Sequence, residues 1–281
     1  MNIFGATASG ISIPLAAGLG LGWAGALRIW AVLCIIAIIL WLPQLKGREG
    51  KTSVSEGTTA DLDLDAVAVA VAATAVGRRT AQKVNFWRSP LAWQVTLYMG
   101  LQATIFYSMV AWLPDILIRQ GMNSGRAGWM LSLMQLALIP VSFIGSVLAG
   151  RRGDQRLLAI IGSILVLIGL SGLLRGSSAL AVLWIIILGV GGGLTFSLAM
   201  MFFSLRTKNA DEAARLSGMA QAVGYLLAAF GPMFFGYLHD VTNNWTMPLI
   251  ILLGVAGLCL VAGLGASRDL YVGSAGADRR L

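Results

Sequence analysis

Long apolar runs fill most of this sequence, and their length constrains the fold more than any other feature. A helix needs ~20 mainly apolar residues to cross ~30 Å of hydrocarbon. Eight stretches meet that condition, at roughly 3–22, 25–42, 90–112, 127–149, 157–174, 179–204, 215–238 and 246–266. Only a helix satisfies its own backbone hydrogen bonds within lipid. The sequence therefore predicts an all-α, polytopic membrane protein with eight transmembrane helices.

Composition supports lipid as the main surrounding medium. The chain is 57% hydrophobic and 11% charged, and its mean hydropathy is +0.81. A soluble domain could not bury so much apolar surface. The net charge of +8 comes from basic residues that separate the apolar runs instead of gathering on one face. We therefore expect the lipid bilayer, and no nucleic acid, as a partner.

The basic residues predict how the chain crosses the membrane. Sixteen of the 20 Lys and Arg residues fall in alternate connections or beside them, in 43–89, 150–156, 205–215 and the tail after 267. The remaining four basic residues lie on the other side of the membrane: Arg28, Arg119, Arg126 and Arg175. Because cytoplasmic loops of inner-membrane proteins are rich in Lys and Arg, we expect a multi-pass cytoplasmic (inner) membrane protein with both termini in the cytoplasm.

One long connection divides the chain. We expect two transmembrane helices in 1–42, a cytoplasmic loop in 43–89, six helices in 90–266 and a cytoplasmic tail in 267–281. The loop contains an eleven-residue apolar run at 66–76, which is too short to cross a bilayer. A linker is one interpretation of this loop, and a regulatory or partner site is another.

Polar residues inside the apolar spans are the candidates for solute binding, because an unpaired polar group is costly in hydrocarbon. In the span at 90–112, Gln94, Tyr98 and Gln102 recur every four residues and so share one helical face. At about 1.5 Å per residue, Gln102 lies near mid-membrane.

A second polar stripe occurs in the span at 215–238. Ser217, Gln221 and Tyr225 repeat the four-residue spacing, and Gln135 reaches a similar depth from the other side. Two interpretations stay open for both stripes. The side chains either bond neighbouring helices together or line a shared cavity that binds a small solute.

Glycines mark the span at 179–204, and Thr195 follows them as a further candidate for binding. Close packing against another helix through Gly189 and Gly193 is one interpretation. The other is a bend point in a moving helix, formed by Gly189, Gly191, Gly192 and Gly193.

The sequence contains no catalytic or metal-binding motif in a sequence context that would support it. The sequence shows no zinc-ligand pair, serine elbow or dinucleotide loop, so we expect no catalytic residues, no metal and no cofactor, and not an enzyme. The acidic residues all lie in connections or at span edges. The single histidine, His239, is followed by Asp240, and a local pair is favoured over a catalytic role.

A short basic connection introduces a family resemblance. Residues 145–157, GSVLAGRRGDQRL, resemble the loop repeated between helices in major facilitator superfamily transporters. Gly150 stands where that motif has Asp, while Arg151 fits it. The resemblance implies a charge clamp at this loop, in a form rearranged around Asp154 with Arg151, Arg152 and Arg156.

Two longer stretches resemble the cyanate and nitroimidazole permease branch of that family. They are 111–140 and 214–245. The family has twelve helices in two halves, so the resemblance implies that this chain covers helices five to twelve: the last two of the N-terminal half and all six of the C-terminal half. It looks N-terminally truncated, and the missing helices on a separate chain are a candidate partner.

The resemblance implies a permease that moves a small organic or anionic solute by alternating access. A truncated chain without transport activity fits the same resemblance. The alternative is a membrane interaction protein that transports nothing, or the remnant of a split transporter.

Overall fold

The computed structural model describes residues 31–32, 85–151, 153–176 and 180–273. Ala31 and Val32 are helical. The predicted spans at 3–22 and 25–42 lie outside the described residues, apart from these two. So do most of the loop at 43–89, Arg152 and the end of the tail.

From residue 85 onward, the described part of the chain contains a short 3-10 helix followed by six long α-helices. The 3-10 helix is η1 (Phe86–Arg88), and the α-helices are α4 (Pro90–Arg119), α5 (Ser124–Arg151), α6 (Arg156–Leu174), α7 (Ala181–Leu205), α8 (Ala210–Thr242) and α9 (Thr246–Ala266). Each is long and apolar enough to cross a membrane. They match the last six of the eight predicted spans, so the structure confirms an all-α architecture, and eight helices stay a prediction.

Capping explains why α8 is longer than predicted. The helix begins at Ala210, five residues before the predicted start, because the Asn209 side chain accepts a hydrogen bond from the Glu212 amide at 2.9 Å. It ends at Thr242, and the next residue, Asn243, has a φ of 51°, the left-handed conformation typical of a helix C-terminus. The predicted span covered only the apolar part of this helix.

The helix α4 also continues past its predicted end, from 112 to Arg119. Pro114 lies inside the helix without ending it. The buried side chains of Leu113, Ile116 and Leu117 continue the apolar face. Packing of that face stabilises the last two turns of the helix.

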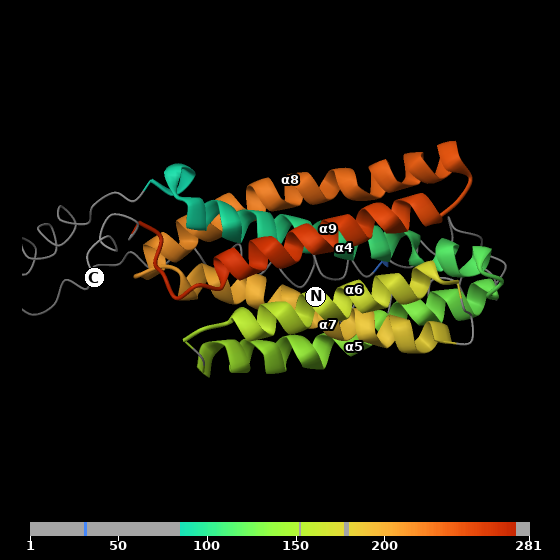
Figure 1. The fold of residues 1–281 in the computed structure, drawn as a ribbon, viewed down its shortest axis with the longest axis horizontal. Coiled ribbons are helices and arrows are strands. Elements are labelled where there is room, and N and C mark those ends of the chain that lie inside the picture. Colours follow the sequence, from blue (N-terminus) through green and yellow to red (C-terminus); the bar gives the residue numbers. More distant parts are fainter. Residues whose placement is uncertain (1–30, 33–84, 152, 177–179, 274–281) are drawn as a thin grey trace, which may run out of the picture. The chain divides into compact units, whose positions relative to one another are not determined.

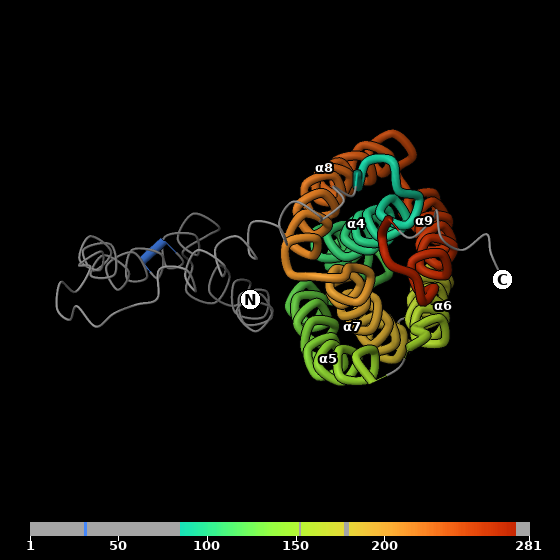
Figure 2. Tube along the Cα trace, turned by 90° about the vertical axis from the view of Figure 1, so that its left-hand side faces the viewer, coloured from blue at the N-terminus to red at the C-terminus, as the bar shows by residue number. Residues whose placement is uncertain are grey.

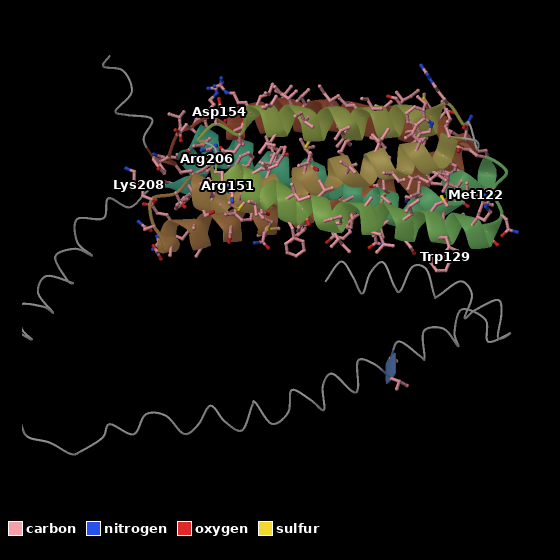
Figure 3. All side chains as sticks on the ribbon, turned by 90° about the horizontal axis from the view of Figure 1, so that it is seen from below. Met122, Trp129, Arg151, Asp154, Arg206 and Lys208 are labelled. Carbon is pink, nitrogen blue, oxygen red and sulfur yellow. The ribbon has the colours of Figure 1, made fainter. Side chains whose placement is uncertain are left out.

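The helices form two rows of three. One row contains α8, α4 and α9, and the other contains α5, α7 and α6 (Figure 1). Seen end-on, α4 and α7 are the middle helices of their rows and lie against each other (Figure 2). Polar side chains mark one end of this bundle, with Arg151, Asp154, Arg206 and Lys208, while Met122 and Trp129 lie at the opposite end (Figure 3). We call these the Arg206 end and the Arg119 end.

Glycines on α7 allow both of its neighbours in the row to approach closely. A Cβ added to Gly193 would lie 2.6 Å from the carbonyl oxygen of Leu138 on α5, and one on Gly189 would lie 2.5 Å from that of Met134. On the other side, a Cβ on Gly191 would lie 2.7 Å from the backbone nitrogen of Val166 on α6. These distances leave no room for a methyl group. Close packing through Gly189 and Gly193 is thus confirmed, whereas bending at this segment stays a prediction.

A second glycine contact joins α4 to α8. A Cβ on Gly100 would lie 3.0 Å from the Cα of Gly224, so the two backbones nearly touch. Further along, a Cβ on Gly231 would lie 2.9 Å from the Ser108 hydroxyl. Small residues at helix contacts are typical of membrane bundles, because dispersion contacts must replace the hydrophobic effect between helices.

Two glycine-to-alanine variants on α7, one at a close contact and one away from it, test this packing. Gly193→Ala should lower the free energy of unfolding by about 1–3 kcal/mol, because the new methyl group meets the α5 backbone. Gly192→Ala is the control: its Cβ would lie 3.6 Å from the Leu138 side chain, which is an ordinary contact. Unfolding of the detergent-purified protein measures both. Equal stability of the two variants would contradict this account of the packing.

Candidate functional site

A small cavity lies among α4, α5, α6, α7 and α9. Its volume is about 30 Å³, enough for roughly two water molecules or one end of a solute. Apolar side chains form most of the wall, including Phe106, Met109, Leu138, Val166 and Leu188. The wall also contains Gln102, Ser163, Thr195 and Cys259, and no charged side chain.

Two polar atoms of the cavity lining have no hydrogen-bond partner among the described residues. They are Oε1 of Gln102 and Oγ of Ser163, on side chains that are 5% and 2% exposed. A buried polar atom without a partner costs about 1–3 kcal/mol. Thr195 differs, because its hydroxyl donates to the carbonyl of Gly191, 3.0 Å away on its own helix. Gln102 and Ser163 are therefore the groups best placed to bond a solute or water.

The other members of the first polar stripe lie between α4 and α9. A Cβ on Gly263 would lie 2.7 Å from the Tyr98 ring, and one on Gly265 would lie 2.5 Å from Gln94 Cδ. The phenol ring also contacts Phe202, with 5.5 Å between centroids. The structure thus brings Gln102, but neither Gln94 nor Tyr98, to the cavity. The stripe shares one helical face as predicted, but most of that face is filled by α9.

The second polar stripe lies elsewhere. Gln221 is half-buried and Tyr225 is 38% exposed on α8, which contributes nothing to the cavity lining. The Tyr225 ring contacts Tyr107 instead, with 6.3 Å between centroids. Within the described residues, the cavity at Gln102 therefore takes a residue from the first stripe and none from the second. Gln135 is buried on α5 at 6% exposure but is not part of the cavity lining. Solute contacts by Gln135, Gln221 and Tyr225 stay predictions.

The loop that resembles the family motif forms a local pair. The Asp154 carboxylate accepts from the Arg156 amide at 2.8 Å and lies 3.8 Å from the Arg156 guanidinium. Both side chains are more than half exposed. Gly150 and Arg151 are exposed, and within the described residues Arg151 makes no ion pair. Of the expected rearranged clamp, the described residues, which leave out Arg152, contain the pair of Asp154 with Arg156, and that pair joins no second helix.

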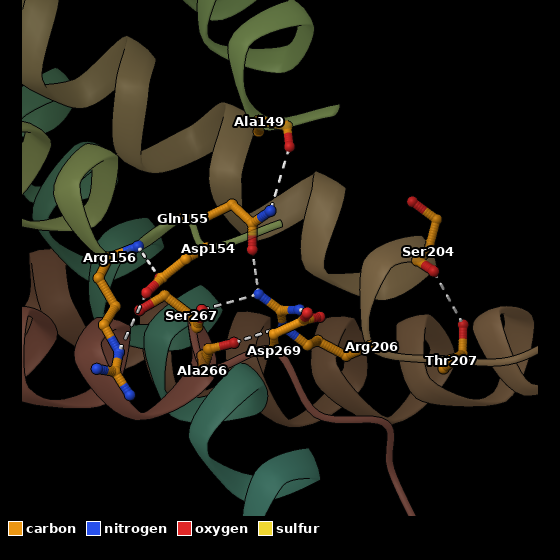
Figure 4. Close-up of polar contacts among 10 residues, drawn as sticks. All are labelled: Ala149, Asp154, Gln155, Arg156, Ser204, Arg206, Thr207, Ala266, Ser267 and Asp269. Atoms are coloured by element: carbon orange, nitrogen blue, oxygen red, sulfur yellow. Dashed lines mark hydrogen bonds and ion pairs between the residues drawn. The ribbon is translucent and has the colours of Figure 1, made fainter. Parts of the chain in front are cut away.

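The buried polar centre of this end is instead Arg206, which sequence reasoning missed (Figure 4). Its side chain is 1% exposed. It donates to the carbonyl oxygens of Ala266 at 2.8 Å and Ser267 at 3.0 Å, at the end of α9. It also donates to Oε1 of Gln155. Because Gln155 in turn donates to the Ala149 carbonyl at 3.2 Å, one guanidinium connects the ends of α5, α6, α7 and α9.

Electrostatics support a charged Arg206 despite its burial. Burial lowers the pKa of Arg206, and the carboxylate of Asp269, 3.7 Å away, acts in the opposite direction. An arginine stays protonated at neutral pH under such conditions. No spacing in the sequence distinguishes Arg206 from the other basic residues that follow apolar spans.

Removing this side chain should be costly. Arg206→Gln should lower the free energy of unfolding by about 3 kcal/mol, because it leaves buried carbonyl oxygens without donors. Asp269→Asn is the control and should cost less than about 1 kcal/mol, since that carboxylate is 71% exposed. Thermal unfolding in detergent compares the two. A larger loss for the Asp269 variant would show that the ion pair, and not the carbonyl contacts, stabilises this end.

The sequence is similar to a transporter family and to several named transporters. The model of the Major Facilitator Superfamily matches residues 1–232 and 120–276. The chain is 44% identical over 274 residues to the uncharacterized transporter YycB of Bacillus subtilis (strain 168), covering 97% of this chain and 62% of that protein. It is 35% identical over 269 residues to the 2-nitroimidazole transporter of Escherichia coli (strain K12), covering 96% and 62%.

A shorter match links the chain to the cyanate transport protein CynX of Escherichia coli (strain K12), with 30% identity over 159 residues, 57% of this chain and 41% of that protein. The chain spans about 62% of the length of the first two relatives. The relatives are named as transporters and not as enzymes. With six helices of membrane-spanning length and a family match over nearly its whole sequence, this chain belongs to the Major Facilitator Superfamily.

Proposed function

We propose that the chain is part or all of a permease for a small, neutral, planar solute, working by alternating access, and that the cavity at Gln102 binds one end of that solute. The observation that carries the proposal is the lining of the cavity. It combines an apolar wall with two buried polar atoms that have no partner and contains no charged side chain. Ligand sites with few polar groups in an apolar wall use those groups to fix orientation.

The lining favours a neutral solute over an anion. An anion in a low-dielectric site needs a cation or several donors nearby, and the described lining offers neither. A ring N–H or hydroxyl could donate to Oε1 of Gln102, beside an apolar wall that includes Phe106 and Leu138. A solute of the 2-nitroimidazole type, as transported by the relative, meets these requirements better than cyanate does.

The glycines of α7 support movement of the solute past this helix. Gly189 and Gly192 line the cavity beside Thr195, so a solute can approach the backbone there. We propose that rotation of this half against the other opens and closes access to the cavity, as expected for carriers built from repeats.

Transport kinetics test the role of Gln102. Gln102→Leu should raise KM for 2-nitroimidazole about tenfold, because one hydrogen bond to the solute is lost. Gln94→Leu makes the same chemical change on the same helix but outside the cavity, and its KM should stay within about twofold. The measurement is solute uptake into liposomes that contain the purified protein.

A carrier of this kind binds its solute at the interface between its halves. The assay is therefore run with two proteins: the chain alone, and the chain fused to the part of YycB that the match leaves uncovered. If neither form moves the solute faster than empty liposomes do, the permease proposal is wrong. If transport occurs but Gln102→Leu equals the parent protein, the transport proposal stands and the assignment of the cavity is wrong.

Orientation has its own test. The charge distribution predicts that the Arg206 end faces the cytoplasm and the Arg119 end faces outward. A reporter fused after Leu281 should then be active in the cytoplasm, and one inserted after Gly121, in the turn between α4 and α5, should report the outer side. Five helices, α5 to α9, lie between the two fusion points, so reporting from the same compartment by both fusions would contradict an odd number of crossings by these helices.

A further inference from the structure

The 3-10 helix η1 presents a tryptophan and an arginine at the Arg206 end of the bundle (Figure 1). Phe86 is buried, and η1 contacts both α4 and α8, so its position on the bundle is fixed. Trp87 is 61% exposed, and Arg88 is exposed as well. Neither of these two residues lines the cavity at Gln102. The surface at η1 is therefore separate from the proposed transport site.

Two indole rings form the centre of this surface. The rings of Trp87 and Trp93 meet edge to face, with 5.9 Å between centroids and 67° between planes. Nε1 of Trp93 donates to the Trp87 carbonyl at 2.9 Å, which ties the start of α4 to η1. Within the described residues, Nε1 of Trp87 makes no hydrogen bond. One exposed indole N–H is therefore available to an acceptor outside the chain.

Arg88 is a cation that forms no ion pair within the described residues. The carboxylates that form ion pairs at this end do so with other arginines: Asp154 with Arg156, Asp211 with Arg215, and Asp269 with Arg206. Neither η1 nor the first turn of α4 contains an acidic residue. A guanidinium presents its donors in a planar fork that matches a phosphate. Arg88 and the neighbouring indole N–H can therefore bind one phosphate group together.

An apolar track leads from these donors along α4 into the part of the helix that spans the membrane. Trp93, Leu97 and Leu101 recur every four residues and so share one face of the helix. Leu97 is 43% exposed, and Leu101 is half-buried. The rise from Trp93 to Leu101 is about 12 Å, which is most of the ~15 Å depth of hydrocarbon in one leaflet. An acyl chain can pack along this length.

Donors and an apolar track together favour a phospholipid over a soluble anion, because only a phospholipid uses both. The absence of acidic residues from η1 and the first turn of α4 favours an anionic headgroup. A zwitterionic headgroup also carries an ammonium, which would find no carboxylate there. By the predicted orientation this end faces the cytoplasm, and the cytoplasmic leaflet is the one with the anionic lipids.

We propose that η1 and the start of α4 bind one anionic phospholipid, with its phosphate on Arg88 and the Trp87 indole. An acyl chain of this lipid lies along Leu97 and Leu101. The site goes beyond the proposed permease function and does not rest on it, since lipid binding needs neither transport nor the cavity at Gln102. Because η1 contacts α8 as well as α4, the bound lipid lies where it can brace these two helices against each other.

Native mass spectrometry of the delipidated full chain in detergent tests the proposal. The probes are phosphatidylglycerol and phosphatidylcholine with the same acyl chains. The first phosphatidylglycerol should bind at least about fivefold more tightly than the first phosphatidylcholine, because one basic residue at the headgroup contributes about that factor. Arg88→Gln should weaken the first phosphatidylglycerol about fivefold. Arg156→Gln removes the same charge at the same end, on α6 in the other row of helices, and should change the affinity less than about twofold.

A second pair of variants examines the indole. Trp87→Phe keeps an aromatic ring and removes the N–H donor, so phosphatidylglycerol should weaken about threefold. Trp129→Phe makes the same change at the Arg119 end, where the side chain is 56% exposed (Figure 3), and should leave the affinity unchanged. The side chains altered in both pairs of variants are exposed, so all four variants should melt at the temperature of the parent protein.

The proposal is overturned if phosphatidylcholine binds the parent protein as tightly as phosphatidylglycerol does, or if Arg88→Gln binds phosphatidylglycerol like the parent protein. Displacement of the lipid by the same concentration of glycerol phosphate, which has no acyl chains, would also overturn it, because the site would then be one for a soluble phosphate. If a variant fails to fold, the comparison of the two lipids on the parent protein decides.

Discussion

The contact of α7 with the backbones of α5 and α6 is the constraint on which the rest of the bundle depends. Gly189 and Gly193 admit the α5 backbone, and Gly191 admits α6. This spacing fixes α7 between its neighbours and against α4. The cavity at Gln102 lies beside this segment of α7, with Gly189 and Gly192 in its lining.

Much of this arrangement could be predicted from the sequence. Apolar length located all six described helices, since hydrocarbon thickness sets a minimum span. The spacing of Gly189 and Gly193 correctly indicated a close helix contact. The depth of Gln102 and Thr195 was also informative, because both lie at one cavity. These features follow from the local sequence and from the thickness and low polarity of the membrane, so a single sequence is enough to predict them.

The direction in which each helical face points could not be predicted. Gln102 lies two residues, or about 200°, from Gly100, where α4 contacts α8. Its stripe therefore faces away from the stripe on α8, and only the packed bundle reveals this. Arg206 was missed for a similar reason: its partners are Gln155 and the end of α9, which lie 51 and 60 residues away along the chain. The start of α8 could not be predicted from the apolar pattern either, because it is set by capping from the Asn209 side chain, which lies outside that pattern.

The hydroxyl group of Thr195 bonds within its own helix, and the same holds for Thr96, Thr104 and Ser197, whose oxygens lie 2.7 to 2.9 Å from carbonyls three or four residues earlier. Such bonds travel with the helix when it shifts. Sliding or rotation of α4 and α7 past their neighbours would then break none of them. The bonds between helices that would resist the motion come from other side chains, such as Arg206 at the end of α7 and Trp112 on α4, whose Nε1 donates to the Pro232 carbonyl of α8 at 2.8 Å. A bundle whose hydroxyls were shared between helices would be locked in a single register.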